Sequence, residues 1–368
     1  MSVITNIATS LPAYKHKQEA IAEFMAELLH FPELKRKKLK TLYASSGIDT
    51  RYSVIADYSL PSAERTFFTK STSSGLVKTL EQRMKLYTDN ALNLSLKAVR
   101  ECVPSTINYS DITHLITVSC TGLYAPGLDI DIIQSLRLNE NISRTSINFM
   151  GCYAAMHAIK QADAICKSTE DAVVLIVCVE LCSIHFQTKD DIDNITANLL
   201  FADGAGASLI VSDHLAAAKK WKGFKIKNFH SQVDLNGKSD MVWQLSSTGF
   251  LMTLSKYIPQ LIEKGIQRLF EKAIAKLNVK KEDIRHWAIH PGGKKILSVI
   301  QQELGLNDTD TESSRRILRE YGNMSSSTIL FVLKDILNTK ASDNPAGLTF
   351  CVAFGPGLTM ESALFENV

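Results

Sequence analysis

The chain has 368 residues, of which 45% are hydrophobic and 21% are charged, and its formal net charge at pH 7 is +3. This length allows one large or two medium domains with substantial buried cores, and so small a charge argues against a nucleic-acid-binding protein. No apolar run reaches the roughly 18 residues that a membrane helix needs, so we expect no membrane span. The first six residues lack the pattern of a secretory leader.

Cysteine usage agrees with a reducing compartment. Of the seven cysteines, four lie in apolar, strand-like settings, as buried reduced thiols do: Cys120, Cys178, Cys182 and Cys351. Cys178 and Cys182 are spaced Cys-x-x-x-Cys, but no second Cys or His pair stands at zinc-finger spacing. We therefore expect a cytoplasmic protein without a structural metal.

The first half of the chain alternates between helical and strand patterns. Residues 17–30 and 88–100 each place apolar side chains on one helical face, which predicts two packing helices. Short apolar runs over 114–118, 172–179 and 206–211 predict buried strands. The run over 172–179 is nearly continuous and β-branched, which is typical of a central strand covered on both faces.

The second half repeats this alternation. We predict helices over 258–277, 294–304 and 325–337 and strands over 287–289 and 348–354. Strands that alternate with helices indicate parallel sheets with helical cover. Two such halves, meeting around residues 215–235, suggest an internally duplicated α/β protein.

Cys152 is the first candidate for chemistry. It follows a short apolar run that breaks at Gly151, and an Ala-rich stretch comes after it. This pattern predicts a strand, a tight turn and a buried helix, with the thiol in the first helical turn. Unpaired N–H groups and the helix dipole favour a thiolate there. A lone Cys at a helix start is nevertheless more often structural than catalytic.

His290 and Asn323 are possible partners for this thiol. His290 ends an apolar strand and precedes Pro-Gly-Gly, while Asn323 stands in the turn Tyr-Gly-Asn-Met-Ser-Ser. An imidazolium can pair with a thiolate, and an amide offers an N–H donor without a proton transfer. Read alone, His290 could cap its strand, and Asn is common in turns because it tolerates left-handed backbone. Cys, His and Asn together, each in a Gly-punctuated turn, favour catalysis.

Five segments together resemble the chalcone synthase-like, or type III polyketide synthase, family. In chain order they are Gly151-Cys152-Tyr153-Ala154, Leu200 to Ala207, His290-Pro291-Gly292-Gly293, Tyr321 to Ser326 and Phe354 to Thr359. The resemblance implies an α/β protein with the thiolase fold, internally duplicated, in five layers αβαβα. Residues 1–220 would form the half that carries the nucleophile, and residues 221–368 the half that carries His and Asn.

The resemblance also implies an activity. Such an enzyme loads an acyl starter from coenzyme A onto Cys152, extends it by decarboxylative condensation with malonyl-CoA, and releases or cyclises the product. Cys152, His290 and Asn323 would be the catalytic residues, with coenzyme A thioesters as substrates and no separate cofactor. A homodimer is implied as well, although Ala125 stands where the family has a Met that reaches into the partner's cavity.

The family's gate between the cavity and the coenzyme A tunnel maps onto two positions. Phe201 matches the first gatekeeper Phe, for which core packing is the alternative reading. The second gatekeeper position holds Met252 instead of the usual Phe. Methionine is softer and more adaptable.

The resemblance assigns four further cavity residues. Ser325 matches the family's Ser beside the catalytic Cys. Cys182 and His185 occupy places usually held by Thr, and Trp243 falls where plant enzymes have a small residue such as Gly. An indole and an imidazole would consume cavity volume, so we do not expect a plant-like chalcone product.

One basic cluster lies between residues 35 and 40, and such runs are most often solvated helix faces. In the family, basic residues in this neighbourhood bind the phosphates of coenzyme A, and Lys38 aligns with one of them. Thr41 and Ser45 stand where the family has two others. We expect phosphate contacts from Lys38 with Lys35 or Lys40.

Three alternative functions fit parts of the pattern. A β-ketoacyl-acyl carrier protein synthase III performs one condensation, but usually has His-Gln-Ala-Asn where this chain has His290-Pro291-Gly292-Gly293. A hydroxymethylglutaryl-coenzyme A synthase needs a Glu base ahead of the Cys, and none is placed convincingly. A non-catalytic thiolase-fold subunit that binds acyl chains tends to lose the nucleophile, which this chain keeps.

Overall fold

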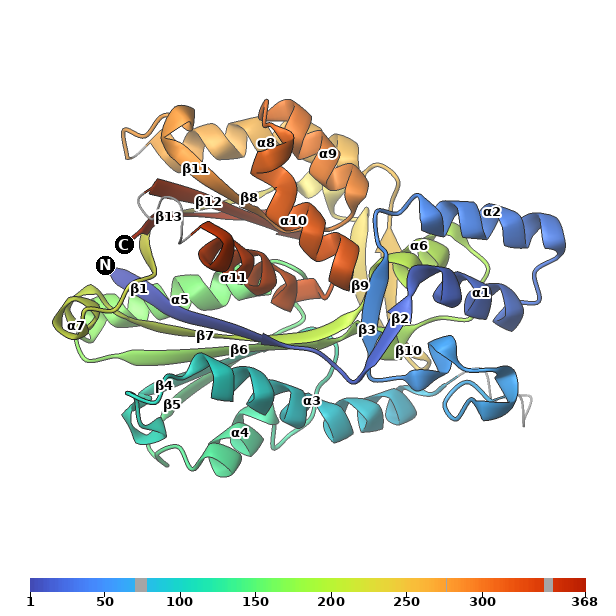
Figure 1. Cartoon of the computed structure of the whole chain (residues 1–368), viewed down its shortest axis with the longest axis horizontal. Helices are drawn as coiled ribbons and strands as arrows, with labels where there is room; N and C mark the ends of the chain where they lie inside the picture. Colours follow the sequence, from blue (N-terminus) through green and yellow to red (C-terminus); the bar gives the residue numbers. More distant parts are fainter. Residues whose placement is uncertain (70–77, 276, 341–346) are drawn as a thin grey trace.

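The computed structural model describes residues 1–69, 78–275, 277–340 and 347–368 and stacks them in five layers (Figure 1). The outer helical layers are α8 (Ile258–Ala275), α9 (Lys294–Glu303) and α10 (Asp308–Tyr321) on one side, and α3 (Leu80–Cys102) and α4 (Leu128–Leu136) on the other. The central helices α5 (Ala154–Ser168) and α11 (Thr328–Lys340) lie between the two strand layers. The predicted five-layer thiolase-like fold is confirmed.

Nine strands make up the two strand layers. Their order is β11-β12-β13-β8-β1-β7-β6-β4-β5. The first layer holds β11 (Ile284–Ile289), β12 (Gly347–Gly355), β13 (Thr359–Asn367) and β8 (Phe224–Val233); the second holds β1 (Ser2–Ser10), β7 (Asp203–Ser212), β6 (Val173–Leu181), β4 (His114–Ser119) and β5 (Ser143–Asn148). Only Val3↔Lys225 and Ile4↔Phe224 pair across the junction of β1 and β8, so the two layers diverge from one shared edge.

The expectation of parallel sheets is wrong for part of each layer. β4 runs parallel to β5 and β6, and β11 runs parallel to β12. β7 is antiparallel to β1 and β6, and β13 is antiparallel to β12 and β8. β12 and β13 are joined by only residues 356–358, and so short a connection permits antiparallel pairing alone.

Most predicted elements are present with adjusted ends. All nine residues of β6 are buried, as expected of a central strand covered on both faces. The helix predicted over 88–100 begins earlier, at Leu80, because Thr79 and Gln82 form a capping box that starts it. The helix predicted over 325–337 begins with a short 3-10 turn at Ser325–Ser327 before α11.

Smaller elements gather at one end of the layered core (Figure 1). They are the pair β2 (Tyr14–Lys17) and β3 (Thr50–Ser53), the pair β9 (Met241–Ser246) and β10 (Gly249–Leu254), and the helices α1 (Gln18–Leu28), α2 (Glu33–Ala44) and α6 (Ile192–Leu200). The remaining helix, α7 (Asp213–Lys219), lies at the opposite end. The carboxyl ends of β6 and β11 point toward the smaller elements, so residues that follow these strands meet there.

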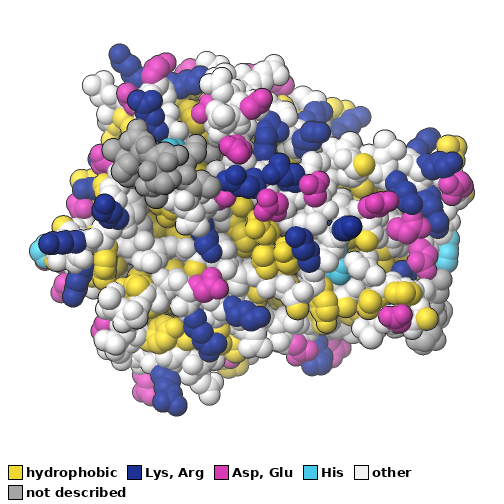
Figure 2. Space-filling model, in the orientation of Figure 1, with side chains coloured by type: hydrophobic (Ala, Val, Ile, Leu, Met, Phe, Trp, Pro, Cys, Tyr) yellow, Lys and Arg dark blue, Asp and Glu magenta, His cyan; other side chains and the backbone are white. Residues whose placement is uncertain are grey.

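The molecular surface carries mixed charge. On the face shown in Figure 2, Lys and Arg side chains are interspersed with Asp and Glu. Within the described ranges, no helix is long and apolar enough to cross a membrane.

Candidate active site

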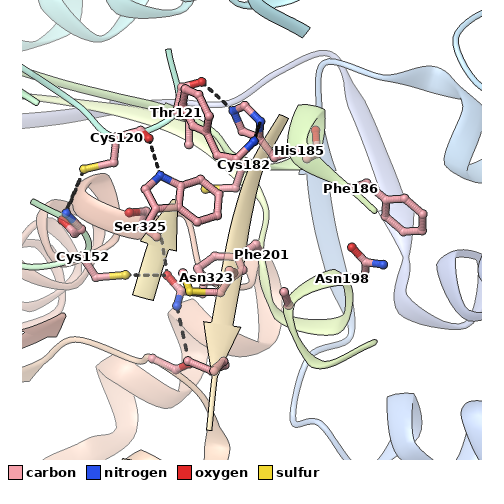
Figure 3. Close-up of a pocket in the computed structure, with 18 of the residues that line it drawn as sticks. Cys120, Thr121, Cys152, Cys182, His185, Phe186, Asn198, Phe201, Asn323 and Ser325 are labelled. Carbon is pink, nitrogen blue, oxygen red and sulfur yellow. Dashed lines mark hydrogen bonds between the residues drawn. The ribbon is translucent and has the colours of Figure 1, made fainter. Parts of the chain in front are cut away.

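One apolar pocket brings the two halves of the chain together. All nine residues predicted for catalysis or substrate binding line it: Cys152, Cys182, His185, Phe201, Trp243, Met252, His290, Asn323 and Ser325. Figure 3 shows several of them around the pocket. The first four belong to the predicted first half and the other five to the second. The fold therefore assembles one site from residues that are far apart in sequence.

Cys152 lies in a tight turn just before α5. Gly151 has φ +84°, and a Cβ there would lie 2.4 Å from Cδ of Pro356, so only Gly fits. The N–H of Gly151 donates to Sγ of Cys120 at 3.0 Å, which fixes the turn. α5 begins at Ala154, two residues after the thiol. The prediction that Cys152 stands in the first helical turn is therefore wrong: Cys152 lies just outside the helix, immediately before its N-cap residue Tyr153.

Burial dominates the charge state of this thiol. Cys152 is 8% exposed, and desolvation raises the pKa of its thiol to about 12. Hydrogen bonds from Ser325 and Asn323 act in the opposite direction, while the nearby Glu180 carboxyl raises the pKa further. The expectation that the helix start alone favours a thiolate is not met. A thiolate at Cys152 needs a cationic partner.

His290 is the buried base beside the pocket. It follows β11, where its backbone N–H donates to the oxygen of Val352 at 2.8 Å. Its side chain is buried, and neither ring nitrogen has a hydrogen-bond partner among the described residues. The strand-capping alternative, in which the ring bonds a neighbouring carbonyl, is therefore not supported. Burial lowers the pKa of His290 to about 3, so the isolated ring is a neutral proton acceptor.

Asn323 connects the thiol to the His290 turn. Its side-chain oxygen accepts from the N–H of Ser325 at 2.9 Å and from Sγ of Cys152 at 4.0 Å. Its side-chain nitrogen donates to the oxygen of Gly292 at 3.5 Å. This nitrogen carries a second N–H, which can donate to a substrate oxygen.

Backbone hydrogen bonds of Asn323 hold the segment that contains Phe201 next to it. Asn323 donates to the oxygen of Leu200 at 2.9 Å, and Ala202 donates to the oxygen of Asn323 at 2.9 Å. The oxygen of Phe201 accepts from Arg51 at 2.6 Å. The predicted gatekeeper is thus tied by its neighbours to a predicted catalytic residue.

An aromatic cluster forms one wall of the pocket. The rings of His185 and Phe250 are stacked with centroids 4.2 Å apart, and Trp243 meets both edge-on. Nε1 of Trp243 donates to the oxygen of Cys120 at 2.7 Å. Met252 pairs directly opposite Trp243 in the β9–β10 ribbon, so both side chains lie on one face of it.

His185 is held as a neutral ring within this cluster. Its Nδ1 accepts the N–H of Phe250 at 3.1 Å, and its Nε2 contacts the oxygen of Thr121 at 2.7 Å. Nε2 therefore carries the proton. Burial lowers the pKa of His185 to about 3, so it adds polarity to the pocket but no charge.

Glu180 is a polar group that the sequence reasoning missed. It is fully buried near the end of β6 and accepts from the N–H of Cys120 at 2.9 Å and the hydroxyl of Thr121 at 2.8 Å, and also from the hydroxyl of Ser326. Burial raises the pKa of this carboxyl to about 7. The sequence did contain a signal for this residue, because a single carboxylate within an otherwise apolar strand indicates a buried polar contact. Its contacts link the Cys120 turn to the segment after Asn323.

The three predicted coenzyme A lysines lie outside the pocket lining. Lys35 forms an ion pair with Asp190, and Lys40 forms one with Glu23 at 2.8 Å. Lys38 is exposed. The charges of two of the three lysines are thus balanced locally, and a phosphate contact by Lys38 stays a prediction. In the described part of the chain, no group of three or more His, Cys, Asp or Glu side chains could hold a metal ion.

Known proteins share this architecture over the whole chain. The profile of the N-terminal domain of chalcone and stilbene synthases matches residues 1–214, and that of the C-terminal domain matches residues 229–368. The alpha-pyrone synthesis polyketide synthase-like Pks18 of Mycobacterium tuberculosis is 29% identical over 369 residues, which is 100% of this chain and 92% of that protein.

Two solved structures are also similar. PKS-I from the brown alga Ectocarpus siliculosus superposes with a TM-score of 0.91 at 27% identity, covering 100% of this chain and 98% of that one. The C-terminal type III polyketide synthase domain of Steely1, a type I/III hybrid from Dictyostelium, superposes with a TM-score of 0.88 at 26% identity, covering 100% and 99%.

Proposed function

The chain belongs to the chalcone and stilbene synthase family of type III polyketide synthases, and we propose that it loads an acyl starter from coenzyme A onto Cys152 and extends it with malonyl-CoA. The family consists of transferases that catalyse decarboxylative condensation. The observation that carries the proposal is the meeting of Cys152, His290 and Asn323 in one apolar pocket, with both ring nitrogens of His290 unpartnered among the described residues.

The loading step begins with a proton transfer. The thiol proton of Cys152 passes to His290, and the resulting thiolate–imidazolium pair carries no net charge in the buried site. The thiolate attacks the carbonyl carbon of the acyl thioester, where a C–S bond forms. The bond to the coenzyme A sulfur then breaks. The leaving thiolate takes up the proton that His290 received, so coenzyme A leaves as a thiol and His290 returns to its neutral form.

The extension step uses His290 and Asn323 as donors. The bond between the carboxylate and the α-carbon of malonyl-CoA breaks, carbon dioxide leaves, and the electron pair remains as an enolate. N–H groups of His290 and Asn323 stabilise the enolate oxygen, and one such donor contributes about 2.7–4 kcal/mol in comparable sites. The α-carbon attacks the acyl–Cys152 thioester, and the Cys152 thiolate leaves. The chain is then released or cyclised, or returned to Cys152 for another round.

Product analysis tests this function. The purified protein is incubated with malonyl-CoA and a panel of aliphatic and aromatic acyl-CoA starters, and the products are identified by mass spectrometry. We expect condensed products that carry few malonyl units. Malonyl-CoA that stays intact with every starter would contradict the proposal. A single extension with every starter would favour the alternative of a synthase III-like condensation.

The aromatic cluster is proposed to limit chain length. Trp243 lines the pocket opposite Met252 and contacts the stacked rings of His185 and Phe250. Trp243→Gly should therefore open the cavity and lengthen the product by at least one malonyl unit. The side chain is only partly buried, so we expect a smaller stability loss than the roughly 3–5 kcal/mol of a core aromatic truncation.

Gln244→Gly is the matched control for this prediction. It places the same residue in the same strand, but at an exposed position on the opposite face of the ribbon. Product masses and melting temperatures of both variants are compared with the wild type. Unchanged products from Trp243→Gly, or equally lengthened products from Gln244→Gly, would refute the limiting role.

We further propose a homodimer built on the edge strand β5. β5 ends the nine-stranded order and, within the described ranges, pairs with β4 alone. Its other edge therefore offers backbone groups to a second copy. Light scattering should give about twice the chain mass of 40.8 kDa, or 81.6 kDa. A mass near 41 kDa at micromolar concentration would rule this out. A cytoplasmic location stays a prediction.

A further inference from the structure

Gln187 is a buried amide in the pocket wall whose two ends have different surroundings. The residue is 6% exposed and lines the pocket. Its side-chain nitrogen donates to the oxygen of His185 at 2.9 Å and to the oxygen of Thr248 at 3.2 Å. A primary amide has two N–H groups, so both are used. These bonds also fix the orientation of the amide, because the reverse orientation would place its oxygen against two carbonyl oxygens.

The oxygen end of this amide has no donor. Within the described ranges, no residue donates a hydrogen bond to Oε1 of Gln187. The nitrogen end faces the backbone of His185 and Thr248, so the oxygen end faces the pocket that Gln187 lines. A buried acceptor without a donor costs about 1–3 kcal/mol. A ligand that brings a donor to Oε1 therefore gains affinity over one that does not.

Asn198 holds the backbone of Gln187 in place. Its side-chain oxygen accepts from the N–H of Gln187 at 3.3 Å, and its side-chain nitrogen donates to the oxygen of Gln187 at 2.8 Å. In Figure 3, Asn198 and Cys152 lie on opposite sides of the pocket. Gln187, which is bonded to Asn198, thus belongs to the part of the pocket that is remote from the nucleophile. The distal end of an acyl group on Cys152 would lie there.

The surroundings of this amide favour a neutral donor. A Cβ on Gly249 would lie 3.3 Å from Nε2 of Gln187 and 2.7 Å from Cδ of Arg83. Arg83 is 1% exposed, and a cationic ligand group beside its buried guanidinium would be repelled. The adjoining lining residues Phe186 and Phe250 are aromatic. A hydroxyl group is a small neutral donor that fits such a wall.

We infer that Gln187 selects an acyl starter that carries a hydroxyl group remote from its thioester, and that this hydroxyl donates to Oε1 of Gln187. The inference rests on the proposed function, because it assumes that an acyl starter on Cys152 occupies the pocket. Gln187 sets specificity and takes no part in bond making. The competing reading is structural: Gln187 would only tie the backbones of His185 and Thr248 together.

Matched starters separate the two readings in the wild type. Acyl-CoA starters of increasing chain length are supplied with a terminal hydroxyl or with a terminal fluorine, which is similar in size but donates no hydrogen bond. The value of kcat/KM for condensation with malonyl-CoA is measured for each pair. At the chain length that reaches Gln187, the hydroxyl form should be preferred by about tenfold, the size of one hydrogen bond. Equal values at every chain length would overturn the inference.

Gln187→Met tests the residue itself. Methionine is similar in length, but its sulfur is only a weak acceptor, so the preference for the hydroxyl form should fall to about one. A purely structural role would lower kcat/KM for both forms equally and leave their ratio unchanged, which would also overturn the inference. Gln244→Met, the same substitution at an exposed position of β9, is the control and should keep the wild-type preference.

Direct binding makes the test independent of turnover. The same starters are titrated calorimetrically into Cys152→Ala, which cannot take up the acyl group. The Kd of the hydroxyl form should be about tenfold lower than that of the fluorine form, and the two should be equal in Cys152→Ala/Gln187→Met. If the wild type condenses malonyl-CoA with no starter, the proposed function fails, and the titration still decides the role of Gln187. If it condenses both forms equally well, only the inference fails.

Discussion

Cys152→Ala is expected to abolish condensation. Without the thiol no acyl–enzyme bond can form, and the loss of a nucleophile costs on the order of 10⁶-fold in a comparable covalent enzyme. The His290 and Asn323 donors remain, so the variant should still decarboxylate malonyl-CoA to acetyl-CoA. Product formation is followed by mass spectrometry, and acetyl-CoA by liquid chromatography. Retained decarboxylation would show that the variant is folded and binds substrate.

Cys182→Ala is the matched control. Cys182 is a second buried thiol in the same pocket, and burial raises its pKa well above its ordinary value. It has no proposed covalent role, so its replacement should leave condensation largely intact. Wild-type product formation by Cys152→Ala would refute the assignment of the nucleophile. Complete loss in Cys182→Ala alone would transfer that role to the other thiol.

His290→Ala is expected to have the next largest effect. Burial raises the pKa of the Cys152 thiol, and an imidazolium formed at His290 would favour the thiolate and offset that effect. When His290 is removed, this offset is lost, so the thiolate should form only at a higher pH than in the wild type. Iodoacetamide labelling of Cys152 should therefore slow at pH 8 and its pH profile should move upward. Condensation should fall by at least 10²–10³-fold, because an enolate donor is lost as well.

Asn323→Ala separates the two roles of His290. An amide cannot accept the thiol proton, so this variant should lose about 10²–10³-fold in condensation. Its labelling profile should move upward less than that of His290→Ala, because only the Asn323 hydrogen bond to the thiol is lost. The measurement is the labelling rate between pH 6 and pH 11, with Cys152 identified by peptide mapping. Equal upward shifts in both variants would contradict the division of labour between His290 and Asn323.

The charge state of Cys152 shows where sequence reasoning stopped. The pattern around Gly151 correctly predicted a turn before a buried helix. A helix start stabilises an anion by at most about 2 kcal/mol. Burial raises the pKa of the thiol from 9.0 to about 12, and three pKa units correspond to ~4 kcal/mol. Desolvation therefore outweighs the helix dipole, and it depends on tertiary packing that the local sequence does not contain.

The sequence allowed some of the other site residues to be predicted and not others. Cys152, His290 and Asn323 could be predicted because each lies in a turn at the end of a strand or the start of a helix. Gly residues in the sequence mark these turns. Glu180 was not predicted because it stands within an apolar run and its partners are distant in sequence. They come from the Cys120 turn and from Ser326. The antiparallel position of β13 was missed because alternation of strands and helices says nothing of a three-residue connection.

The central claim is that Cys152 carries the growing chain as a thioester, and peptide mass spectrometry tests it directly. The protein is incubated with an acyl-CoA starter, digested at low pH, and the peptide that contains Cys152 is weighed. We predict that this peptide gains the mass of the acyl group and loses it when malonyl-CoA is added, as extended product appears. Product formation with this peptide unmodified, or with the acyl group on another residue, would contradict the account.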